Sequence, residues 1–274
     1  MSARQGLGLA KRSNGAIAQL VEHLHGMQGV SGSSPLGSTD SNPGKARVFF
    51  MVSGSTTYEQ GRRVDIAVFD VDHTLLDGDC VLLLARTLHP MPSFLLRSLG
   101  LLPSLLAWSL GRCPTDRFKE LFLARFILSS PPDPPHPRLM RLLSGEFSHR
   151  LVARLRPAAL ARLRWHQEQG HRVILCSASP RIVLQGLADR LGVEIVATEL
   201  MAAEGRWLPK LQGANCKGPE KIRRLESYLG GLDSLRIEAY GDSKGDRELL
   251  KRADLPHYRS FLPTPTPYPQ RRNS

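Results

Sequence analysis

VDIAVFDVDHTLLDGD, residues 64–79, is the stretch that decides the fold of this chain. Its apolar run from Ile66 to Phe69 predicts a short buried strand. The run leads directly into a segment that carries one threonine and four aspartates, at Asp70, Asp72, Thr74, Asp77 and Asp79. Like charges this close repel one another, so either a cation lies among them or some carboxyl groups stay protonated. The stretch therefore predicts a strand that ends in a charged site.

The bulk composition is that of a globular protein with a bias toward anionic partners. The 274 residues are 41% hydrophobic and 23% charged, which allows one substantial domain with an insertion, or two small domains. Four cysteines lie far apart without a C-x-x-C pair, which argues against a disulfide framework or a zinc site and fits a reducing cytoplasm. The net charge of +12 favours phosphoesters, nucleic acid or anionic lipid without choosing among them.

The two ends of the chain are expected to lie outside the fold. Residues 1–60 are rich in Gly and Ser, and 17–39 resembles the conceptual translation of a transfer-RNA gene, with Gln19–His23 as the D-arm and Gly32–Pro35 as the T-arm. Two interpretations stay open: a start-site artefact, with the true start near Met51, or a native disordered leader. The proline-rich tail 263–274 is expected to be disordered as well.

Strands alternate with helices through the rest of the chain. Apolar runs predict further strands at 171–176, 193–198 and 237–242. Helices are predicted at Cys80–Leu88, from Pro157 to near Gly170, at 181–191 and at 219–229. The segment Glu204–Arg206 is typical of a hairpin turn, and 131–137, PPDPPHP, is expected to be a loop. This alternation predicts βαβ units in a doubly wound, parallel α/β sheet.

Three polar clusters, at 70–74, 177–179 and 242–246, each follow the end of a predicted strand. In open α/β sheets the carboxyl ends of strands are where ligands bind, so we expect the three clusters to converge. Carboxylates drawn together from separate loops suggest Mg²⁺, which prefers oxygen ligands and also holds phosphate oxygens. Hydroxyl groups and a lysine would bind the remaining phosphate oxygens. One aspartate would attack phosphorus, and another would protonate the leaving oxygen and later activate water.

These motifs, taken together, resemble those of the haloacid dehalogenase-like hydrolases over residues 64–255. The resemblance rests on Asp70-x-Asp72-x-Thr74, then Ser177, then a lysine, then Gly241-Asp242-x-x-x-Asp246. More narrowly, the chain is similar to the phosphoserine-phosphatase-like subgroup, subfamily IB, because ATEL, EGR and GANCKGPEKIRRL within 197–225 are typical of it. The resemblance implies a Rossmann-like, three-layer core and a helical cap inserted between the first and second motifs.

The resemblance also implies roles for the acidic residues. Asp70 would be the nucleophile and Asp72 the general acid and base. Mg²⁺ would be held by Asp70, by the main-chain carbonyl of Asp72 and by Asp242, while Asp246 would support the metal shell. Asp79 falls where phosphoserine phosphatases carry a glutamate that binds the substrate amine, so it is a candidate for substrate specificity. An aspartate is shorter, however, and a helix cap is the other interpretation of Asp79.

The phosphate-binding residues follow from the same resemblance. Thr74 and Ser177 would bind the phosphoryl group. Two lysines compete for the motif position: Lys221 is preferred because it opens a predicted helix, and Lys217 remains the alternative. Ser179 stays open between a phosphate contact and a helix cap. The last motif departs from the subgroup pattern Gly-Asp-Gly-x-Asn-Asp, because serine and glycine replace its second glycine and its asparagine, at Ser243 and Gly245.

The predicted domain division places the core at 62–80 and 155–262 and the cap at 81–154. Within the cap, the apolar run 91–111 approaches the length of a membrane span but is interrupted by Arg97 and two prolines. We expect either a helix hairpin in the cap or a membrane-facing cap. A phosphatidylglycerophosphate phosphatase of the same superfamily has a similar apolar insert, which makes a lipid phosphate an alternative substrate. The basic stretch 138–164, with seven arginines and one acid, is expected to be a solvated face, and attraction of an anionic substrate is the alternative.

The sequence therefore predicts a Mg²⁺-dependent phosphatase that hydrolyses a small organic phosphomonoester through an aspartyl-phosphate. We expect it in the cytoplasm, either free or peripheral to the inner membrane. A membrane-associated lipid phosphate phosphatase is the alternative, with an anionic membrane surface as its partner. A basic nucleic-acid-binding protein is a weaker alternative, because aromatic residues do not interleave with the arginines of 138–164. A dehalogenase would share the fold but usually lacks the second aspartate, so the presence of Asp72 argues against that activity. Substrate identity and oligomeric state are not given by the sequence.

Overall fold

The computed structural model describes residues 64–128 and 136–262. The expectations for the leader at 1–60, for the tail at 263–274 and for most of the loop at 131–137 therefore lie outside the described residues. The last part of that loop expectation is wrong, because helix α6 (His136–Leu142) already begins at His136. Pro137 is the second residue of this helix. Backbone N–H groups in the first turn have no acceptor within the helix, so the proline, which has no N–H, removes no hydrogen bond there.

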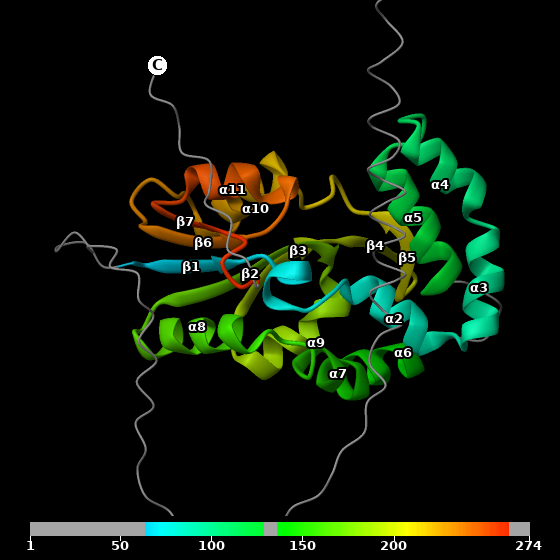
Figure 1. Cartoon of the computed structure of the whole chain (residues 1–274), viewed down its shortest axis with the longest axis horizontal. Helices are drawn as coiled ribbons and strands as arrows, with labels where there is room; N and C mark the ends of the chain where they lie inside the picture. The colour runs from blue at the N-terminus through cyan, green and yellow to red at the C-terminus, as the bar shows by residue number, and fades with distance from the viewer. Residues whose placement is uncertain (1–63, 129–135, 263–274) are drawn as a thin grey trace, which may run out of the picture.

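A parallel five-stranded sheet, in the order β3-β2-β1-β6-β7, forms the core (Figure 1). Its central strand β1 (Ile66–Phe69) pairs with β2 (Arg172–Pro180) on one side and with β6 (Ile237–Gly241) on the other. All four residues of β1 are buried, as expected for a parallel strand that is covered on both faces. The strands β3 (Glu194–Thr198) and β7 (Leu255–Tyr258) form the two edges.

Helices cover both faces of the sheet and complete the predicted three layers. On one face lie α8 (Pro157–Glu168) and α9 (Arg181–Leu191), and on the other lie α10 (Pro219–Leu229) and α11 (Arg247–Arg252) (Figure 1). The side chains of β1 alternate between two hydrophobic clusters, because successive residues of a strand point to opposite faces. The prediction of a Rossmann-like α/β core with a parallel sheet is confirmed.

Two strand predictions need correction. The second strand was expected to end at residue 176, yet β2 runs to Pro180, because its pairing with β3 continues through Ser177 and resumes at Pro180 after an irregularity. The edge strand β7 was not predicted, because its sequence LPHY contains a proline and little apolar alternation. Proline is tolerated in an edge strand, where one row of ladder groups needs no partner. The expected hairpin is present as β4 (Leu200–Ala203) and β5 (Arg206–Leu211).

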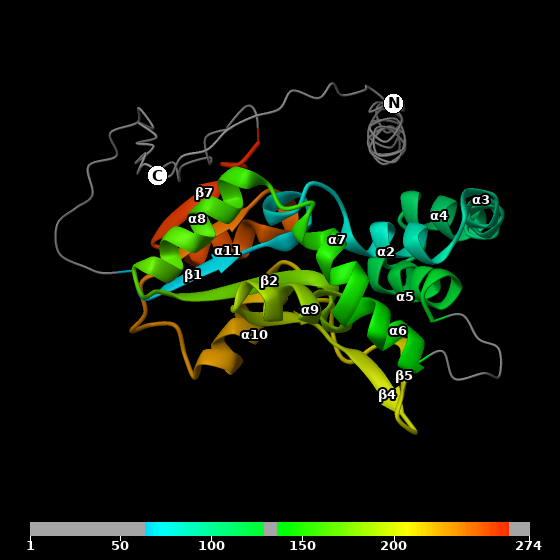
Figure 2. The same ribbon diagram turned by 90° about the horizontal axis from the view of Figure 1, so that it is seen from below.

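The helical insertion lies between β1 and α8, and Figure 2 shows its first helices gathered beyond one end of the sheet. It consists of α2 (Cys80–Leu88), α3 (Met91–Leu99), α4 (Leu102–Ser109), α5 (Thr115–Phe126), α6, the short turn η2 (Leu143–Phe147) and α7 (Ser148–Val152). The last elements, η2 and α7, pack on α9 of the core, whereas α5 packs on the strand β5. The division of core and cap at residue 154 stays a prediction.

The apolar run 91–111 forms α3 and α4, which meet at an angle of 57°. Gly100 and Leu101, which join them, both have right-handed helical backbone angles, so the chain continues forward and does not reverse. The expectation of a hairpin within this run is therefore wrong, and each helix packs on α5 instead. In the part of the chain that the structure describes, no single helix has both the length and the apolar character to cross a membrane; α3 and α4 meet these criteria only as a bent pair.

Candidate active site

The first site residues stand on the segment that follows β1. The backbone N–H of Asp70 donates to the carbonyl oxygen of Tyr240 at 2.9 Å, which extends the pairing of β1 and β6 by one residue. The chain then turns at His73, whose φ of 63° lies in the left-handed region that non-glycine residues seldom adopt. The His73 N–H donates to the carbonyl of Gly78 at 3.1 Å and closes the turn. The turn keeps Thr74, which is buried, beside the ends of β1 and β6.

Lys221 joins the first and last motifs through its ammonium group. It lies in the first turn of α10 and is almost fully buried. Its Nζ donates to Asp70 Oδ1, to Asp246 Oδ1 and to the carbonyl of Cys176, each at 2.6 Å. Burial alone would lower the pKa of Lys221, but the two carboxylates hold that pKa well above its usual value. Lys217, the alternative, is exposed and lies against Gly245.

Asp246 is held by hydrogen bonds on both carboxylate oxygens. Its Oδ2 accepts from the N–H and the hydroxyl of Ser243, at 3.0 and 2.8 Å. Burial raises the pKa of Asp246, but Lys221 and Ser243 outweigh this and lower it. The serine that departs from the subgroup pattern thus has a local purpose, because it caps the turn that carries Asp246. Gly241 is required here, since a Cβ on it would lie 2.5 Å from the Cβ of Asp246.

Three carboxylates meet where the ends of β1 and β6 lie side by side. Asp70, Asp242 and Asp246 each offer one oxygen atom, and these three atoms lie within 4.8 Å of one another. Burial, and next the charge of Asp246, raise the pKa of Asp242. Burial also raises the pKa of Asp70 well above its usual value, although Lys221 opposes this. The raised pKa values of Asp70 and Asp242 indicate that Lys221 alone does not balance the negative charge of the three carboxylates. A donor set made only of oxygen atoms fits a hard divalent cation such as Mg²⁺.

The carboxylate of Asp72 points away from these three groups. Its Oδ1 accepts from the N–H of Cys80 at 2.7 Å, and its Oδ2 accepts from the hydroxyl of Ser179 at 2.5 Å. Burial, and next the negative charge of Asp79, raise the pKa of Asp72. A carboxyl group with a raised pKa is suited to donate a proton. The roles predicted for Asp72, as acid and base and as a metal ligand through its main-chain carbonyl, stay predictions.

The two serines after the second predicted strand lie together. The N–H of Ser179 donates to the hydroxyl oxygen of Ser177 at 3.0 Å, and both side chains are buried. Ser179 contacts Asp72 and does not cap α9, whose cap position is occupied by Pro180. Thr74 donates its hydroxyl proton to Asp242 Oδ1 at 3.2 Å. The expectation that Ser179 caps a helix is therefore wrong, and a phosphate contact of Ser177 and Ser179 stays a prediction.

Asp79 is the N-terminal capping residue of α2, the first helix of the insertion. Its Oδ1 accepts from the N–H of Leu82 at 2.7 Å, at the start of α2. The same carboxylate lies close enough to Asp72 to raise the pKa of Asp72. Asp77, by contrast, is exposed and accepts from Arg156 at 2.9 Å. Of the two interpretations of Asp79, the helix cap is the one for which the structure gives a hydrogen bond, and a role in substrate specificity stays a prediction.

Lys119 is a residue of this region that sequence reasoning missed. It extends from α5 of the cap, and its Nζ donates to the carbonyl of Ala178 at 2.6 Å and to Asn215 Oδ1 at 2.8 Å. Thr198 bonds to the same two acceptors, at 2.6 and 2.9 Å. Burial lowers the pKa of Lys119, and Asp72 is the first of the nearby charges that oppose this. The available signal was a lysine amid the apolar residues of a helix, in FKELF.

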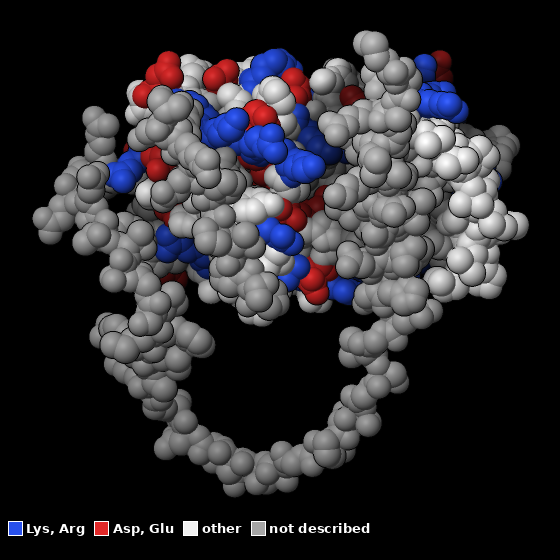
Figure 3. Space-filling view, turned by 45° about the horizontal axis from the view of Figure 1, so that its top comes forward, with Lys and Arg blue, Asp and Glu red and all other residues white. Residues whose placement is uncertain are grey.

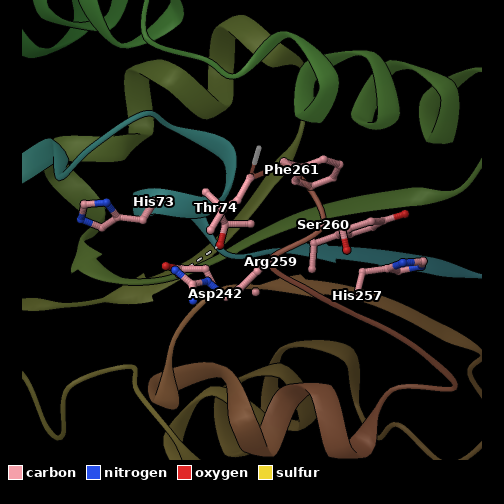
Figure 4. A pocket seen from close by; sticks show the side chains of 10 residues that line it. His73, Thr74, Asp242, His257, Arg259, Ser260 and Phe261 are labelled. Atoms are coloured by element: carbon pink, nitrogen blue, oxygen red, sulfur yellow. Dashed lines mark hydrogen bonds between the residues drawn. The ribbon is translucent and has the colours of Figure 1, made fainter. Parts of the chain in front are cut away.

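A small pocket lies beside Asp242 (Figure 4). One wall is formed by His73, Thr74 and Asp242, with the hydrogen bond between the last two drawn as a dashed line. The other wall comes from the segment after β7, which includes Arg259 and Phe261. This segment was not singled out from the sequence, because no motif marks it. Of the three carboxylates of the cluster, Asp242 is the one that lines this pocket.

The comparisons with known proteins agree with this geometry. A family model for the haloacid dehalogenase-like hydrolases matches residues 67–251. Protein CicA of Caulobacter vibrioides (strain NA1000 / CB15N) is 37% identical over 113 residues, which is 40% of this chain and 50% of CicA. The matched part thus spans about half the length of this curated relative.

Two solved structures are also similar to this chain, and the first extends the comparison to the fold. A protein of unknown function from Bordetella pertussis Tohama I is 23% identical and has a TM-score of 0.59; the match covers 72% of this chain and 90% of that one. A substrate-bound phosphoserine phosphatase is 16% identical with a TM-score of 0.48, covering 72% of this chain and 87% of that one. The first of these likenesses extends over most of both chains and concerns the fold alone.

Proposed function

We propose, from the premise that this chain belongs to the haloacid dehalogenase-like hydrolases, that it is a Mg²⁺-dependent phosphomonoesterase. The observation that carries the proposal is the meeting of three carboxylates, Asp70, Asp242 and Asp246, at the ends of β1 and β6, two of which, Asp70 and Asp246, contact one buried lysine. A buried group of carboxylates lowers the stability of the fold unless cations pair with it, so such a group is a candidate for a functional site that binds a metal ion. The substrate we propose is a small organic phosphate.

In the first step Asp70 attacks the phosphorus atom. The attacking atom is Oδ2, because Oδ1 accepts the hydrogen bond from Lys221. A bond forms between this oxygen and phosphorus while the ester bond to the leaving oxygen breaks. Asp72 gives its proton to the leaving oxygen, and the raised pKa of Asp72 favours the protonated form that this step needs. The products of this step are a free alcohol and an aspartyl-phosphate on Asp70.

In the second step water releases the phosphate. Asp72, now ionised, accepts a proton from the water as its oxygen bonds to phosphorus, and the bond to Asp70 breaks. Inorganic phosphate leaves, and both aspartates return to their starting forms. Lys221 holds Asp70 and Asp246 in fixed positions throughout, and the hydroxyl groups of Thr74 and Ser177 would bind phosphoryl oxygens.

Mg²⁺ would be held by Asp70, Asp242 and the main-chain carbonyl of Asp72. Asp246 fits a supporting role, since its oxygens already accept from Lys221 and Ser243. When bound, the cation supplies positive charge that neutralises the carboxylates and the phosphate oxygens, which is the main requirement of phosphoryl transfer. We propose that the chain acts in the cytoplasm, free or at the membrane surface.

A lipid phosphate is a second candidate substrate class. The observation that favours it is the apolar outer surface of α3 and α4, which is unusual for a cap that would only meet small, water-soluble substrates. Both candidates need the same catalytic groups and differ in what the cap must contact. The substrate class is therefore a question for measurement with both kinds of phosphate.

The experiment that tests the proposal is a phosphatase screen with Mg²⁺ over amino-acid, sugar, nucleotide and lipid phosphates. We expect wild-type protein to release phosphate from at least one class, and chelation of Mg²⁺ to abolish release. The variant Asp70→Asn should lose activity by at least about a thousandfold while it remains folded. Asp77→Asn, a change of the same kind on an exposed aspartate in the same segment, is the matched control and should keep wild-type activity. Near wild-type activity of Asp70→Asn would refute the assignment of the nucleophile.

A further inference from the structure

The outer face of α3 and α4 is an apolar surface with few counterparts elsewhere on the molecule. Among the residues that the structure describes, eleven large hydrophobic side chains are exposed, and seven of them lie between residues 91 and 110. They are Met91, Leu95, Leu96, Leu99, Leu102, Leu106 and Leu110. Their exposed fractions run from 49% to 69%, so each has about half or more of its surface outside the fold. Contiguous apolar surfaces of this kind mark sites of contact with a protein or a membrane.

The two helices are attached to the fold by very few side chains. Phe94 is the buried residue of α3, Leu101 is buried at the bend, and α4 contributes no buried residue. Packing inside the protein therefore accounts for only a small part of the apolar content of this segment. The remaining leucines cover the outside, where Figure 3 shows a broad surface without charged residues at this end of the molecule.

The charged side chains of the segment that contains this face have a single sign. From Cys80 to Thr115 the sequence contains three arginines and no aspartate or glutamate. Those arginines are Arg86, Arg97 and Arg112, and Arg97 is placed at the level of the bend by its hydrogen bond to the carbonyl of Arg125 at 2.6 Å. An apolar segment whose only charged side chains are cations matches a surface that is apolar inside and negatively charged at its edge, although the neighbouring helix α5 also carries Asp116 and Glu120. A bilayer with anionic headgroups has this arrangement.

The geometry favours a surface-bound position over a span. The helices contain nine and eight residues, so neither is long enough to cross a bilayer alone, and they meet at an angle of 57°. Trp108 lies on α4, and its indole N–H donates to the hydroxyl of Thr115 at 3.2 Å. Tryptophan is enriched at the boundary between hydrocarbon and headgroups. A short amphipathic helix, α3, followed by a short apolar helix, α4, is suited to lie in the headgroup region.

We propose that the outer face of α3 and α4 docks this protein on an anionic lipid bilayer. The leucines enter the upper acyl region and the arginines bind lipid phosphates at its edge. This inference deepens the proposed function, because it commits to the membrane surface as the place of action; it rests on the cap surface and on none of the carboxylates of the site. A second copy of the chain on the same face is the competing occupant, and the test is designed to separate the two.

The test is vesicle sedimentation of the full chain. Vesicles of phosphatidylcholine with phosphatidylglycerol are compared with vesicles of phosphatidylcholine alone. We expect binding to the anionic vesicles, weaker binding to the neutral ones, and a partial loss of binding in high salt, which screens the arginines but not the leucines. The variant Leu96→Glu/Leu106→Glu should bind the anionic vesicles at least tenfold more weakly. Met140→Glu/Met201→Glu adds the same charge at exposed hydrophobic positions outside the face and should bind within twofold of wild type.

Three further measurements complete the test. Circular dichroism and the melting temperature of both double variants should match wild type, since neither pair of side chains is buried. Asp70→Asn should bind vesicles as wild type does, so that a failure of catalysis and a failure of docking are told apart. Light scattering reports the mass in solution. The proposal is overturned if wild-type protein stays in the supernatant, if the leucine variant binds as well as wild type, or if those leucines mediate dimer formation without vesicle binding.

Discussion

At the scale of single residues, Lys221 determines the charge balance of the site. Its ammonium group is the buried cation that contacts both Asp70 and Asp246. Without it, these carboxylates would be left facing each other with no positive partner on α10. Removing one partner of a buried ion pair is strongly destabilising, because the charge that remains is buried and unpaired. The preference for this lysine over Lys217 came from its position at a helix start, and the structure places it among the carboxylates.

The first prediction separates the two lysines. Lys221→Met should abolish phosphatase activity and lower the free energy of unfolding by about 3 kcal/mol in EDTA. Part of this loss should return when Mg²⁺ is added, since a cation then neutralises the same carboxylates. Lys217→Met, at an exposed position, should change stability by less than about 1 kcal/mol. Urea unfolding of both variants with and without Mg²⁺ measures this, and equal losses for the two lysines would contradict the assignment.

Other residues show where sequence reasoning stops at this scale. Motif order predicted that Asp70, Thr74, Ser177 and Asp242 would lie near one another, because residues after parallel strands meet at one edge of the sheet. It did not predict the bond from Ser179 to Asp72, since the hydrogen-bond partner of a hydroxyl depends on rotamers and on neighbouring chain segments. It also did not foresee the cap formed by Ser243, which is a local substitution for the usual residue of the motif.

At the scale of elements, the register of three strands brings the motifs together. Phe69 is paired with Leu175 of β2 and with Tyr240 of β6, so the chain continues from the same level toward Asp70, Ser177 and Asp242. This arrangement could be predicted, because strands of parallel sheets are buried apolar runs, and the polar residues after them lie at the carboxyl edge of the sheet, where ligands bind. The orientation of the cap helices could not, because it depends on which side chains pack between α3, α4 and α5, and helical periodicity fits several packings.

The second prediction concerns the link between a cap helix and the core. Lys119 of α5 holds the carbonyl of Ala178, between Ser177 and Ser179, so it positions this segment from outside the core. Lys119→Met should lower kcat/KM by roughly tenfold to a hundredfold, because a small displacement of these serines weakens their contacts in the transition state. Lys119→Arg should recover part of this, and Lys210→Met on β5, at an exposed position, should leave kcat/KM unchanged. Wild-type kinetics in Lys119→Met would contradict a positioning role.

At the scale of the whole molecule, a second buried polar network lies on the face of the sheet that α8 covers. Glu238 of β6 accepts from Arg162 of α8 at 2.6 Å and from the Tyr240 hydroxyl at 2.5 Å. His166 of α8 lies 3.0 Å from the same hydroxyl and is completely buried. Burial, with the nearby cations, lowers the pKa of His166 to about 4. Folding therefore requires this imidazole to be neutral.

The third prediction follows from the lowered pKa of His166. In the unfolded chain its pKa is near 6.5, so between that value and about 4 the unfolded state binds the extra proton. The contribution of His166 to stability is therefore fully present at pH values above its pKa in the unfolded chain. It is lost as the pH falls toward its pKa in the folded protein. Between pH 8 and pH 5 the loss should be about 2 kcal/mol. His166→Gln should show a smaller difference between these pH values in urea unfolding; an identical difference would rule out this residue as the source.

The overall architecture was the easiest feature to predict from the sequence. Alternating strand and helix patterns gave a parallel, doubly wound sheet, and the position of the insertion followed from the distance between Asp70 and Ser177. The edge strand β7 and the pocket segment at 259–262 were missed, because neither has a strong apolar pattern or a motif. Features of this kind are determined by contacts between distant segments, which a single sequence does not display.

The central claim is that Asp70 becomes phosphorylated during the reaction. The most direct measurement uses Asp72→Asn, which can form the phospho-enzyme but lacks the base that activates water. The variant is mixed with Mg²⁺ and p-nitrophenyl phosphate or acetyl phosphate, quenched, and analysed by intact-mass and peptide mass spectrometry. The account predicts an added mass of one phosphoryl group, located on Asp70 and absent when Asp70→Asn is combined with Asp72→Asn. A phosphoryl group on another residue, or wild-type turnover with Asp70 never modified, would contradict it.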